Sequence, residues 1–151
     1  MLNRYPSELT VGEARDRYLV DNGFDLADYQ SHWAKVKLGP IPVYFPNIKA
    51  RRRAVRLHDL HHVATGYDTS LRGEAEIGAW ELGAGCGRYW AAWLLNTSAV
   101  SIGALLCPRR TLRAFRRGRA SQSLYAGDFH DAYLDWTVGE LRQHLGLEPA
   151  T

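Results

Sequence analysis

The chain contains few cysteines: Cys86 and Cys107 are the only two among its 151 residues. Their spacing fits neither a disulfide framework nor a zinc-knuckle motif, and both lie in apolar sequence. No apolar stretch follows the first charged residues, as it would in a signal peptide. These absences predict a cytoplasmic protein whose two thiols are inert in a reducing compartment.

Acidic residues are absent from residues 109–119, although this segment is rich in arginine. Its six arginines are Arg109, Arg110, Arg113, Arg116, Arg117 and Arg119. A second basic group consists of Arg51, Arg52, Arg53 and Arg56. Such groups favour anionic partners, namely a phospholipid surface or a carboxylated or phosphorylated substrate. Nucleic acid is not expected, because no motif that combines basic and aromatic residues accompanies them.

Charged residues of either sign are missing between Tyr89 and Cys107. The length of this stretch raises the question of a membrane span. Asn96, Ser101 and Gly103 interrupt it, however, and favour a buried helix or pair of helices. We therefore predict no spanning helix, and we leave open a peripheral contact with the inner face of a membrane.

The composition and the helix signals predict one compact all-α domain over residues 1–151. Hydrophobic residues make up 46% and charged residues 23% of the chain, as in ordinary globular proteins. Capping residues at Thr10, Asp25, Asn47 and Thr137, a terminal glycine at Gly66 and apolar periodicity predict helices at about 11–22, 26–36, 48–65, 74–93, 108–117 and 138–145. Residues 38–46 contain three prolines and are predicted to form a non-helical connector.

The most informative motif is the segment His58-Asp-Leu-His-His62, followed by Glu74. On a helix that turns about 100° per residue, Asp59 lies about 100° and His62 about 40° from His58. Two imidazoles and a carboxylate on one side of a helix can bind a divalent metal, and Glu74 can supply a fourth ligand. Zinc accepts this mixture of donors and is the preferred ion, with Mg, Mn or Fe as alternatives.

The pattern His-Asp-x-x-His, eleven residues, then Glu resembles the signature of the Coq4 family of ubiquinone-biosynthesis proteins. The resemblance is strong over about residues 44–90, extends to about residue 147 and is absent before residue 40. It implies an all-helical fold, a metal held by His58, Asp59, His62 and Glu74, and an apolar tunnel for a polyprenyl tail. It also implies oxidative decarboxylation, in which a ring carboxyl of a prenylated aromatic acid is replaced by hydroxyl.

Further residues near this motif are candidates for supporting roles. Arg51 shares the face of His58 and could bind a substrate carboxylate, while Asp59 or Glu74 could transfer a proton if it is not a ligand. Glu81 shares a face with Glu74 and could orient a ligating imidazole from behind. The expected partner is a prenylated aromatic or other isoprenoid lipid, and the chain could act as a homodimer or in a biosynthetic complex.

Two other functions fit parts of this pattern. In a phosphohydrolase of the HD type, His58 and Asp59 would combine with His32 and with Asp128 or Asp131, leaving His62 and Glu74 without a role. Alternatively, the protein binds lipid or acts as a scaffold, and its metal is structural. An open coordination position would indicate catalysis, and a closed shell would indicate structure.

Overall fold

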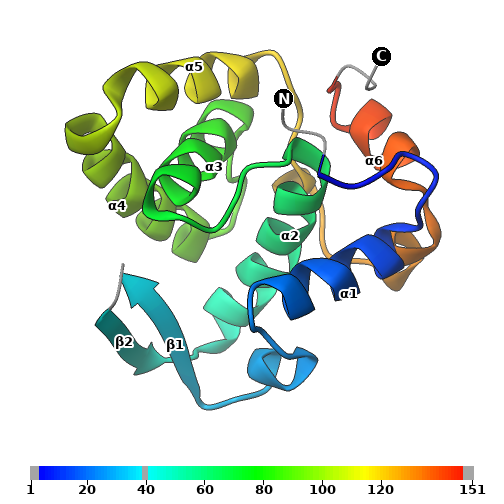
Figure 1. Cartoon of the computed structure of the whole chain (residues 1–151), viewed down its shortest axis with the longest axis horizontal. Helices are drawn as coiled ribbons and strands as arrows, with labels where there is room; N and C mark the ends of the chain where they lie inside the picture. Colours follow the sequence, from blue (N-terminus) through cyan, green and yellow to red (C-terminus); the bar gives the residue numbers. More distant parts are fainter. Residues whose placement is uncertain (1–3, 39–40, 148–151) are drawn as a thin grey trace.

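Helices dominate the described part of the chain, residues 4–38 and 41–147 of a computed structural model (Figure 1). The α-helices are α1 (Val11–Asp21), α2 (Lys49–Thr65), α3 (Leu71–Ala84), α4 (Trp90–Leu106), α5 (Pro108–Arg119) and α6 (Val138–His144). The 3-10 helices are η1 (Leu26–Tyr29), η2 (Leu124–Ala126) and η3 (Asp131–Asp135). The predicted all-α class is confirmed, and a two-stranded hairpin is added to it.

The hairpin corrects the prediction of a helix over residues 26–36. Asp25 does cap a helix, but this helix is the single turn of η1, and the chain then extends into β1 (Trp33–Leu38). β1 pairs in antiparallel register with β2 (Ile41–Pro46), from Trp33 opposite Pro46 to Leu38 opposite Ile41. The sequence from Ala34 to Leu38 alternates apolar residues with lysines, a period of two that favours a strand.

Trp33, at the start of β1, is 61% exposed. Residues 41–46 of the predicted connector are not helical, as predicted, and residues 39–40 lie outside the described part of the chain. Pro42 and Pro46 are compatible with a strand because the two-stranded sheet has only edge strands. Residues 41–46 of the predicted connector are therefore the second strand of a hairpin, and this strand leads into α2.

α2 lies at the centre of the fold, and its apolar side packs into the main core (Figure 1). Leu57 and Leu60 are fully buried there, together with Ile77 and Trp80 of α3. Gly66 ends α2 in the left-handed conformation, with φ of 77°, as the sequence predicts. The N-cap is Ile48 rather than the expected Asn47.

The C-terminal end of α2 is completed by residues distant in the sequence. The fully buried guanidinium of Arg142 on α6 donates hydrogen bonds to the carbonyl of Ala64, at 3.0 Å, and to the carbonyl of Tyr5, at 3.0 Å. It also donates to the hydroxyl of Ser7, at 3.2 Å. Carbonyls at a helix C-terminus lack partners within the helix, so Arg142 both satisfies one of them and places positive charge at the negative end of the helix dipole.

The predicted helix over 74–93 is two helices. α3 ends at Ala84, since Gly85 takes a φ of 97° that a residue with a side chain rarely adopts, and α4 begins at Trp90. Behind α3, α5 approaches at backbone distance: a Cβ on Gly118 would lie 2.0 Å from the Trp80 carbonyl oxygen. Small residues thus allow α3 and α5 to cross closely.

α4 turns much of its apolar surface outward. Trp90 is 56%, Leu94 60% and Leu105 86% exposed, whereas the side facing α3 consists of small or polar residues such as Ala92 and Asn96. Because these apolar side chains lie at the surface, they do not enclose the tunnel that the resemblance implies. In the described part of the chain, no helix is both long and apolar enough to span a membrane.

We predict that Gly118→Ala destabilises the protein by at least about 1–3 kcal/mol, because the new methyl would overlap the Trp80 carbonyl and force α3 and α5 apart. Gly127→Ala is the matched control, since its Cβ would meet only the Tyr133 hydroxyl at 3.9 Å. This control should change stability by less than about 0.5 kcal/mol. Urea unfolding followed by circular dichroism measures both, and equal midpoints would contradict the close crossing.

Candidate metal centre

Three of the four predicted metal ligands converge between α2 and α3. His58, His62 and Glu74 each offer a ligand atom, and these atoms all lie within 4.8 Å of one another. The Nε2 atoms of His58 and His62 are 3.1 Å apart. The Glu74 carboxylate oxygens lie 3.5 Å from the His58 Nε2 and 3.4 Å from the His62 Nε2. The group can therefore hold a metal ion.

Local structure explains the convergence. His58 and His62 are one helical turn apart in the C-terminal half of α2, so their side chains point the same way. Glu74 lies in the first turn of α3, which Ser70 caps by accepting a hydrogen bond from the Gly73 amide. A Cβ on Gly73 would lie 2.1 Å from the Asp68 carbonyl oxygen, so glycine is needed for the tight entry into this helix.

The hydrogen bonds on the far side of each imidazole define which nitrogen faces the site. The Nδ1 of His62 lies 2.8 Å from the carbonyl oxygen of Tyr67, and the Nδ1 of His58 lies 2.9 Å from the Glu81 carboxylate. Both partners only accept, so each Nδ1 carries a proton and each neutral imidazole has its lone pair on Nε2. Two lone pairs that face each other at 3.1 Å need a proton or a metal ion between them.

The separations fit a small divalent cation. With metal–nitrogen distances of 2.0–2.1 Å, neighbouring ligands of a tetrahedral zinc are about 3.3 Å apart. The three separations in the protein, 3.1, 3.4 and 3.5 Å, lie close to this value. The Glu74 side chain is 38% exposed, whereas that of His62 is fully buried, so the group is open on one side.

Glu81 is held behind His58 by a network of buried groups. Its Oε1 accepts from the Nδ1 of His58 and, at 2.6 Å, from the Nδ1 of His61. Its Oε2 accepts from the amide of Asn96 at 2.6 Å and from the hydroxyl of Tyr125 at 3.2 Å. Glu81 thus occupies the position that the sequence analysis gives to an orienting carboxylate, on the imidazole nitrogen that faces away from the site.

His61 belongs to this network and not to the candidate metal centre. Its Nε2 accepts a hydrogen bond of 2.9 Å from the Leu124 amide, so its only other nitrogen is the one that donates to Glu81. Both ring nitrogens are therefore used within the protein. Burial lowers the pKa of His61, which agrees with a neutral ring.

The carboxylates control the charge of the candidate metal centre. Burial lowers the pKa of His58, but the charges and hydrogen bonds of Glu81 and Glu74 outweigh this effect and hold the pKa well above its usual value. For both glutamates burial raises the pKa, but the charges and hydrogen bonds of the neighbouring histidines lower it by more, so that each carboxyl stays ionised well below its usual range. Without a metal, the favoured state is therefore a protonated His58 between two carboxylates.

Asp59, the fourth predicted ligand, lies outside the group of three. It is buried, and one of its carboxylate oxygens accepts a hydrogen bond from the hydroxyl of Tyr29 on η1. Burial raises the pKa of Asp59, while the charges of His58 and His62 act in the opposite direction. Asp59 therefore lies close enough to influence the histidines but is directed to a tyrosine.

Arg51 lies near this acid on the same face of α2. Its guanidinium donates to the side-chain oxygen of Asn47 at 2.9 Å, and Asn47 in turn donates to the carbonyls of Asp28 and Ser31. Burial lowers the pKa of Arg51, and the charge of Asp59 opposes this shift. Asn47, expected to cap α2, instead links Arg51 to η1 and to the segment that follows it.

The residues required for the HD-type interpretation do not join the metal ligands. Asp128 pairs with Arg88 and accepts from the Tyr89 hydroxyl at 3.0 Å. Among the described residues, the metal-binding group contains neither this acid nor His32 nor Asp131. The geometry thus does not favour a phosphohydrolase of this type.

Sequence reasoning did not identify several residues around the centre. Tyr18 of α1 stacks on His62, with ring centroids 5.2 Å apart and planes 24° apart, and Tyr125 and Asn96 bind Glu81. Only Asn96 carried a recognisable signal, as an amide inside an otherwise uncharged apolar stretch. The tyrosines come from distant segments and have no fixed spacing from the motif.

Comparison of the whole chain with protein-family models gives no match, and no curated protein matches it significantly. The assignment of the centre therefore depends on the motif and on its geometry.

We predict that the purified protein binds one divalent metal per chain and that His58→Ala removes most of it, because two ligands from one helix turn are reduced to one. His32→Ala serves as the matched control and should retain the wild-type metal content, since His32 is exposed and outside the group. Elemental analysis measures both. Equal metal content in wild type and His58→Ala would rule out the centre.

The same experiment extends to the two glutamates. Glu74→Gln replaces an anionic ligand and should lose the metal. Glu81→Gln leaves the three ligand atoms in place and should weaken metal affinity by about 10–100-fold, as is usual when a group that orients a ligand is altered.

Proposed function

We propose that this chain is a Coq4-like metalloenzyme that acts on a prenylated aromatic acid and replaces its ring carboxyl with a hydroxyl. The observation that carries the proposal is the convergence of His58, His62 and Glu74, which sit at the Coq4-type spacing and form a group open on one side. Three protein ligands with an open position are typical of catalytic zinc, whereas structural zinc is enclosed by four.

The proposed reaction consumes dioxygen and releases carbon dioxide. A ring carboxyl leaves as carbon dioxide, one atom of dioxygen becomes the new hydroxyl, and the other becomes water with two electrons and two protons from an external donor. A divalent ion at the centre would act as a Lewis acid toward the substrate's carboxylate or adjacent phenolic oxygen. Zinc is the ion that this donor set favours, and because zinc is not redox-active, the electron-rich ring itself would react with dioxygen.

The residues of the chain would bind and orient the acid. Arg51, fixed by Asn47, lies on the face of α2 that carries His58 and can pair with a carboxylate in bidentate fashion. Asp59 is buried, and its raised pKa suits a group that exchanges a proton with a phenol. Tyr29, hydrogen-bonded to Asp59, would keep this carboxyl turned in one direction.

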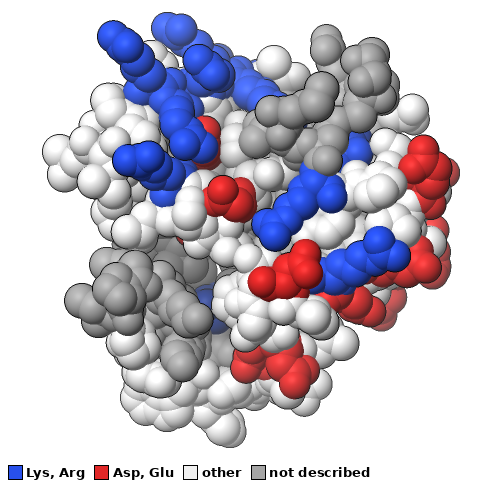
Figure 2. All heavy atoms as spheres, viewed as in Figure 1, with Lys and Arg blue, Asp and Glu red and all other residues white. Residues whose placement is uncertain are grey.

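The surface formed by α4 and α5 suits a substrate that resides in a membrane. Trp90, Trp93 and Leu94 of α4 and Phe115 of α5 are exposed. Figure 2 shows Lys and Arg side chains along the upper left of the molecule, over α5, beside uncharged surface. Exposed tryptophan and leucine next to arginine are typical of proteins that lie at an anionic bilayer surface. We propose that the protein reaches the prenyl tail of its substrate from this surface rather than through a tunnel.

The alternative is a lipid-binding or scaffold protein whose metal has no catalytic role. The two functions differ in turnover and not in metal content, because both need an intact centre. An assay for the reaction itself therefore separates them.

In the presence of dioxygen and a reductant, the metal-loaded protein should convert a short-chain prenylated hydroxybenzoic acid to its hydroxylated product and release carbon dioxide. Glu74→Gln should reduce the rate to background through loss of the metal. Arg51→Gln should keep the metal but lose most of kcat/KM, because the substrate carboxylate loses its partner. Mass spectrometry of the product and labelled carbon dioxide measure the reaction.

His32→Ala provides the control for this assay and should turn over at the wild-type rate. If the metal-loaded wild type converts no prenylated aromatic acid but co-purifies with isoprenoid lipid, this result would contradict the enzymatic function and favour the lipid-binding alternative.

The second prediction of this proposal concerns the membrane surface. The protein should sediment with vesicles of anionic phospholipid, more weakly at high salt, because exposed charges are screened there. A Trp93→Ser/Leu94→Ser variant should bind these vesicles several-fold more weakly, since it buries less apolar area. Val20→Ser removes a 78%-exposed apolar side chain from α1 and should bind as wild type does. Equal binding by all three proteins would contradict the proposed surface.

A further inference from the structure

A cleft lined by basic and aromatic residues lies between η1, the first half of α2 and the segment at 128–131. Its larger part has a volume of about 460 Å³, and an adjoining part of about 200 Å³ shares Tyr29, Gln30, Arg56 and Phe129 with it. Clefts that bind small molecules have volumes of about 300–1,000 Å³. The larger part is therefore of sufficient size for a small organic ligand.

The cations of the cleft come mostly from one side of α2. Lys49, Arg52, Arg53 and Arg56 line the larger part. With about 100° per residue, they lie about 120–220° from His58 around the helix, so they face away from the metal ligands. The cleft is thus separate from the candidate metal centre.

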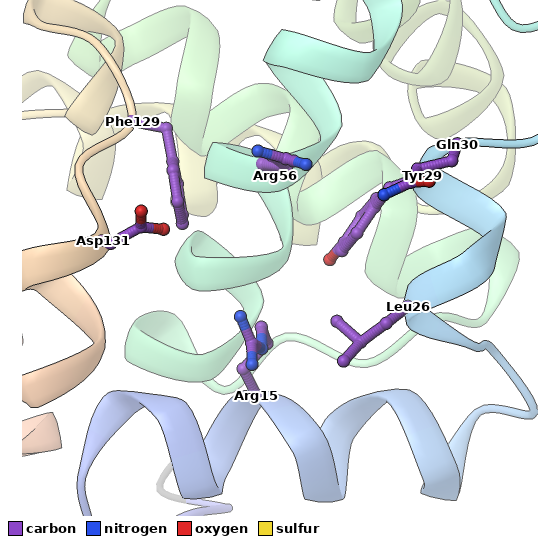
Figure 3. Close-up of a pocket in the computed structure, with 7 residues that line it drawn as sticks. All are labelled: Arg15, Leu26, Tyr29, Gln30, Arg56, Phe129 and Asp131. Atoms are coloured by element: carbon purple, nitrogen blue, oxygen red, sulfur yellow. The ribbon is translucent and has the colours of Figure 1, made fainter.

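Arg56 is held in place by aromatic rings rather than by an acid. Its guanidinium carbon lies 5.6 Å from the ring centroid of Tyr29 and 5.6 Å from that of Phe129. Figure 3 shows the guanidinium between these two rings, with Arg15 rising from α1 and Asp131 to one side. A guanidinium positioned against rings keeps its N–H groups available for an anion.

The charges around the cleft are unbalanced. In residues 4–38 and 41–147, no carboxylate lies within salt-bridge distance of any of the four α2 cations. The two acids at the rim are Asp128, which is bound to Arg88, and Asp131, while Arg15 pairs with Asp16 at 2.7 Å. Four cations around one cleft leave an excess of positive charge that a bound anion would offset.

We propose that this cleft binds a small organic phosphate. A phosphate dianion has three oxygens that accept charge-assisted hydrogen bonds from two or more arginines at once, whereas one carboxylate is satisfied by a single bidentate arginine. The rings of Tyr29, Tyr89 and Phe129 provide apolar wall for the organic part. The proposal does not depend on the metal or on the reaction proposed above.

Tyr29 connects the cleft with the interior. Its ring contacts Arg56 in the cleft, and its hydroxyl donates to Asp59, the neighbour of His58. A phosphate ligand that displaced Arg56 from this ring would act on the residue that orients Asp59. A single side chain, that of Tyr29, therefore links the cleft to Asp59, which is next to His58 in the sequence.

Calorimetric titration with phenyl phosphate, with benzoate as the carboxylate control, tests the site. We expect phenyl phosphate to bind and benzoate to bind at least about tenfold more weakly. Arg56→Gln should weaken phenyl phosphate binding at least about tenfold, and the double variant Arg52→Gln/Arg53→Gln should do the same. Arg116→Gln removes an exposed arginine of α5 and should bind as wild type does.

His58→Ala and a chelator separate this site from the metal. Phenyl phosphate that still binds to His58→Ala in chelator supports the cleft, and binding that disappears there assigns the phosphate to the metal and overturns the proposal. Equal affinity in Arg56→Gln, Arg52→Gln/Arg53→Gln and Arg116→Gln would also overturn it, as would absence of binding up to about 10 mM. If a short oligonucleotide bound far more tightly than phenyl phosphate, a nucleic-acid site would replace the small-molecule site.

Discussion

The fold around the candidate centre depends on one buried ionised carboxylate, that of Glu81. An isolated charge is costly to bury, and the cost is offset when several donors surround it. Glu81 receives hydrogen bonds from His58, His61, Asn96 and Tyr125, which belong to α2, α4 and η2, while Glu81 itself belongs to α3. Four segments must therefore meet at a single carboxylate, and their meeting determines how His58 presents its other nitrogen.

The arrangement also limits what each histidine of the motif can do. Of three neighbouring imidazoles, His61 has both nitrogens occupied inside the core, whereas His58 and His62 each keep one nitrogen for the open side. This division follows from partners that only accept, or only donate, on the buried side. The motif contains three histidines, but the surrounding structure selects two of them as potential ligands.

Much of the centre could be predicted because it depends on helix periodicity. His58 and His62 are four residues apart, and a spacing of one turn ensures a shared face wherever the helix packs. Asp59 shows where that reasoning ends. Its 100° rotation from His58 left its direction undecided, and Tyr29, thirty residues earlier in the chain, determined it. A helical wheel gives the angles between side chains within one helix, but partners from other segments decide which groups point into a site.

The fold was predictable to the same extent and for the same reason. Capping boxes at Thr10 and Thr137 and the glycine after α2 gave helix ends correctly, because each depends on residues within one turn. The hairpin was missed because the helix that Asp25 caps is only a single turn. The start of this helix was predicted correctly, but the predicted helix was too long. The outward direction of α4 could not be read from its sequence, since an apolar stretch suits a buried core and a lipid-facing surface equally well.

The buried guanidinium of Arg142 has a consequence for the order of folding during synthesis. The end of α2 is completed by hydrogen bonds that join residue 142 to residues 5, 7 and 64, so it depends on contacts of very long sequence separation. Glu81 likewise requires Tyr125. On a ribosome, helices up to α5 can form while these partners are still unsynthesised. The helix that carries the two candidate ligands would then reach its final packing only after α6 has emerged. Until then, the interior around this helix would stay accessible to water.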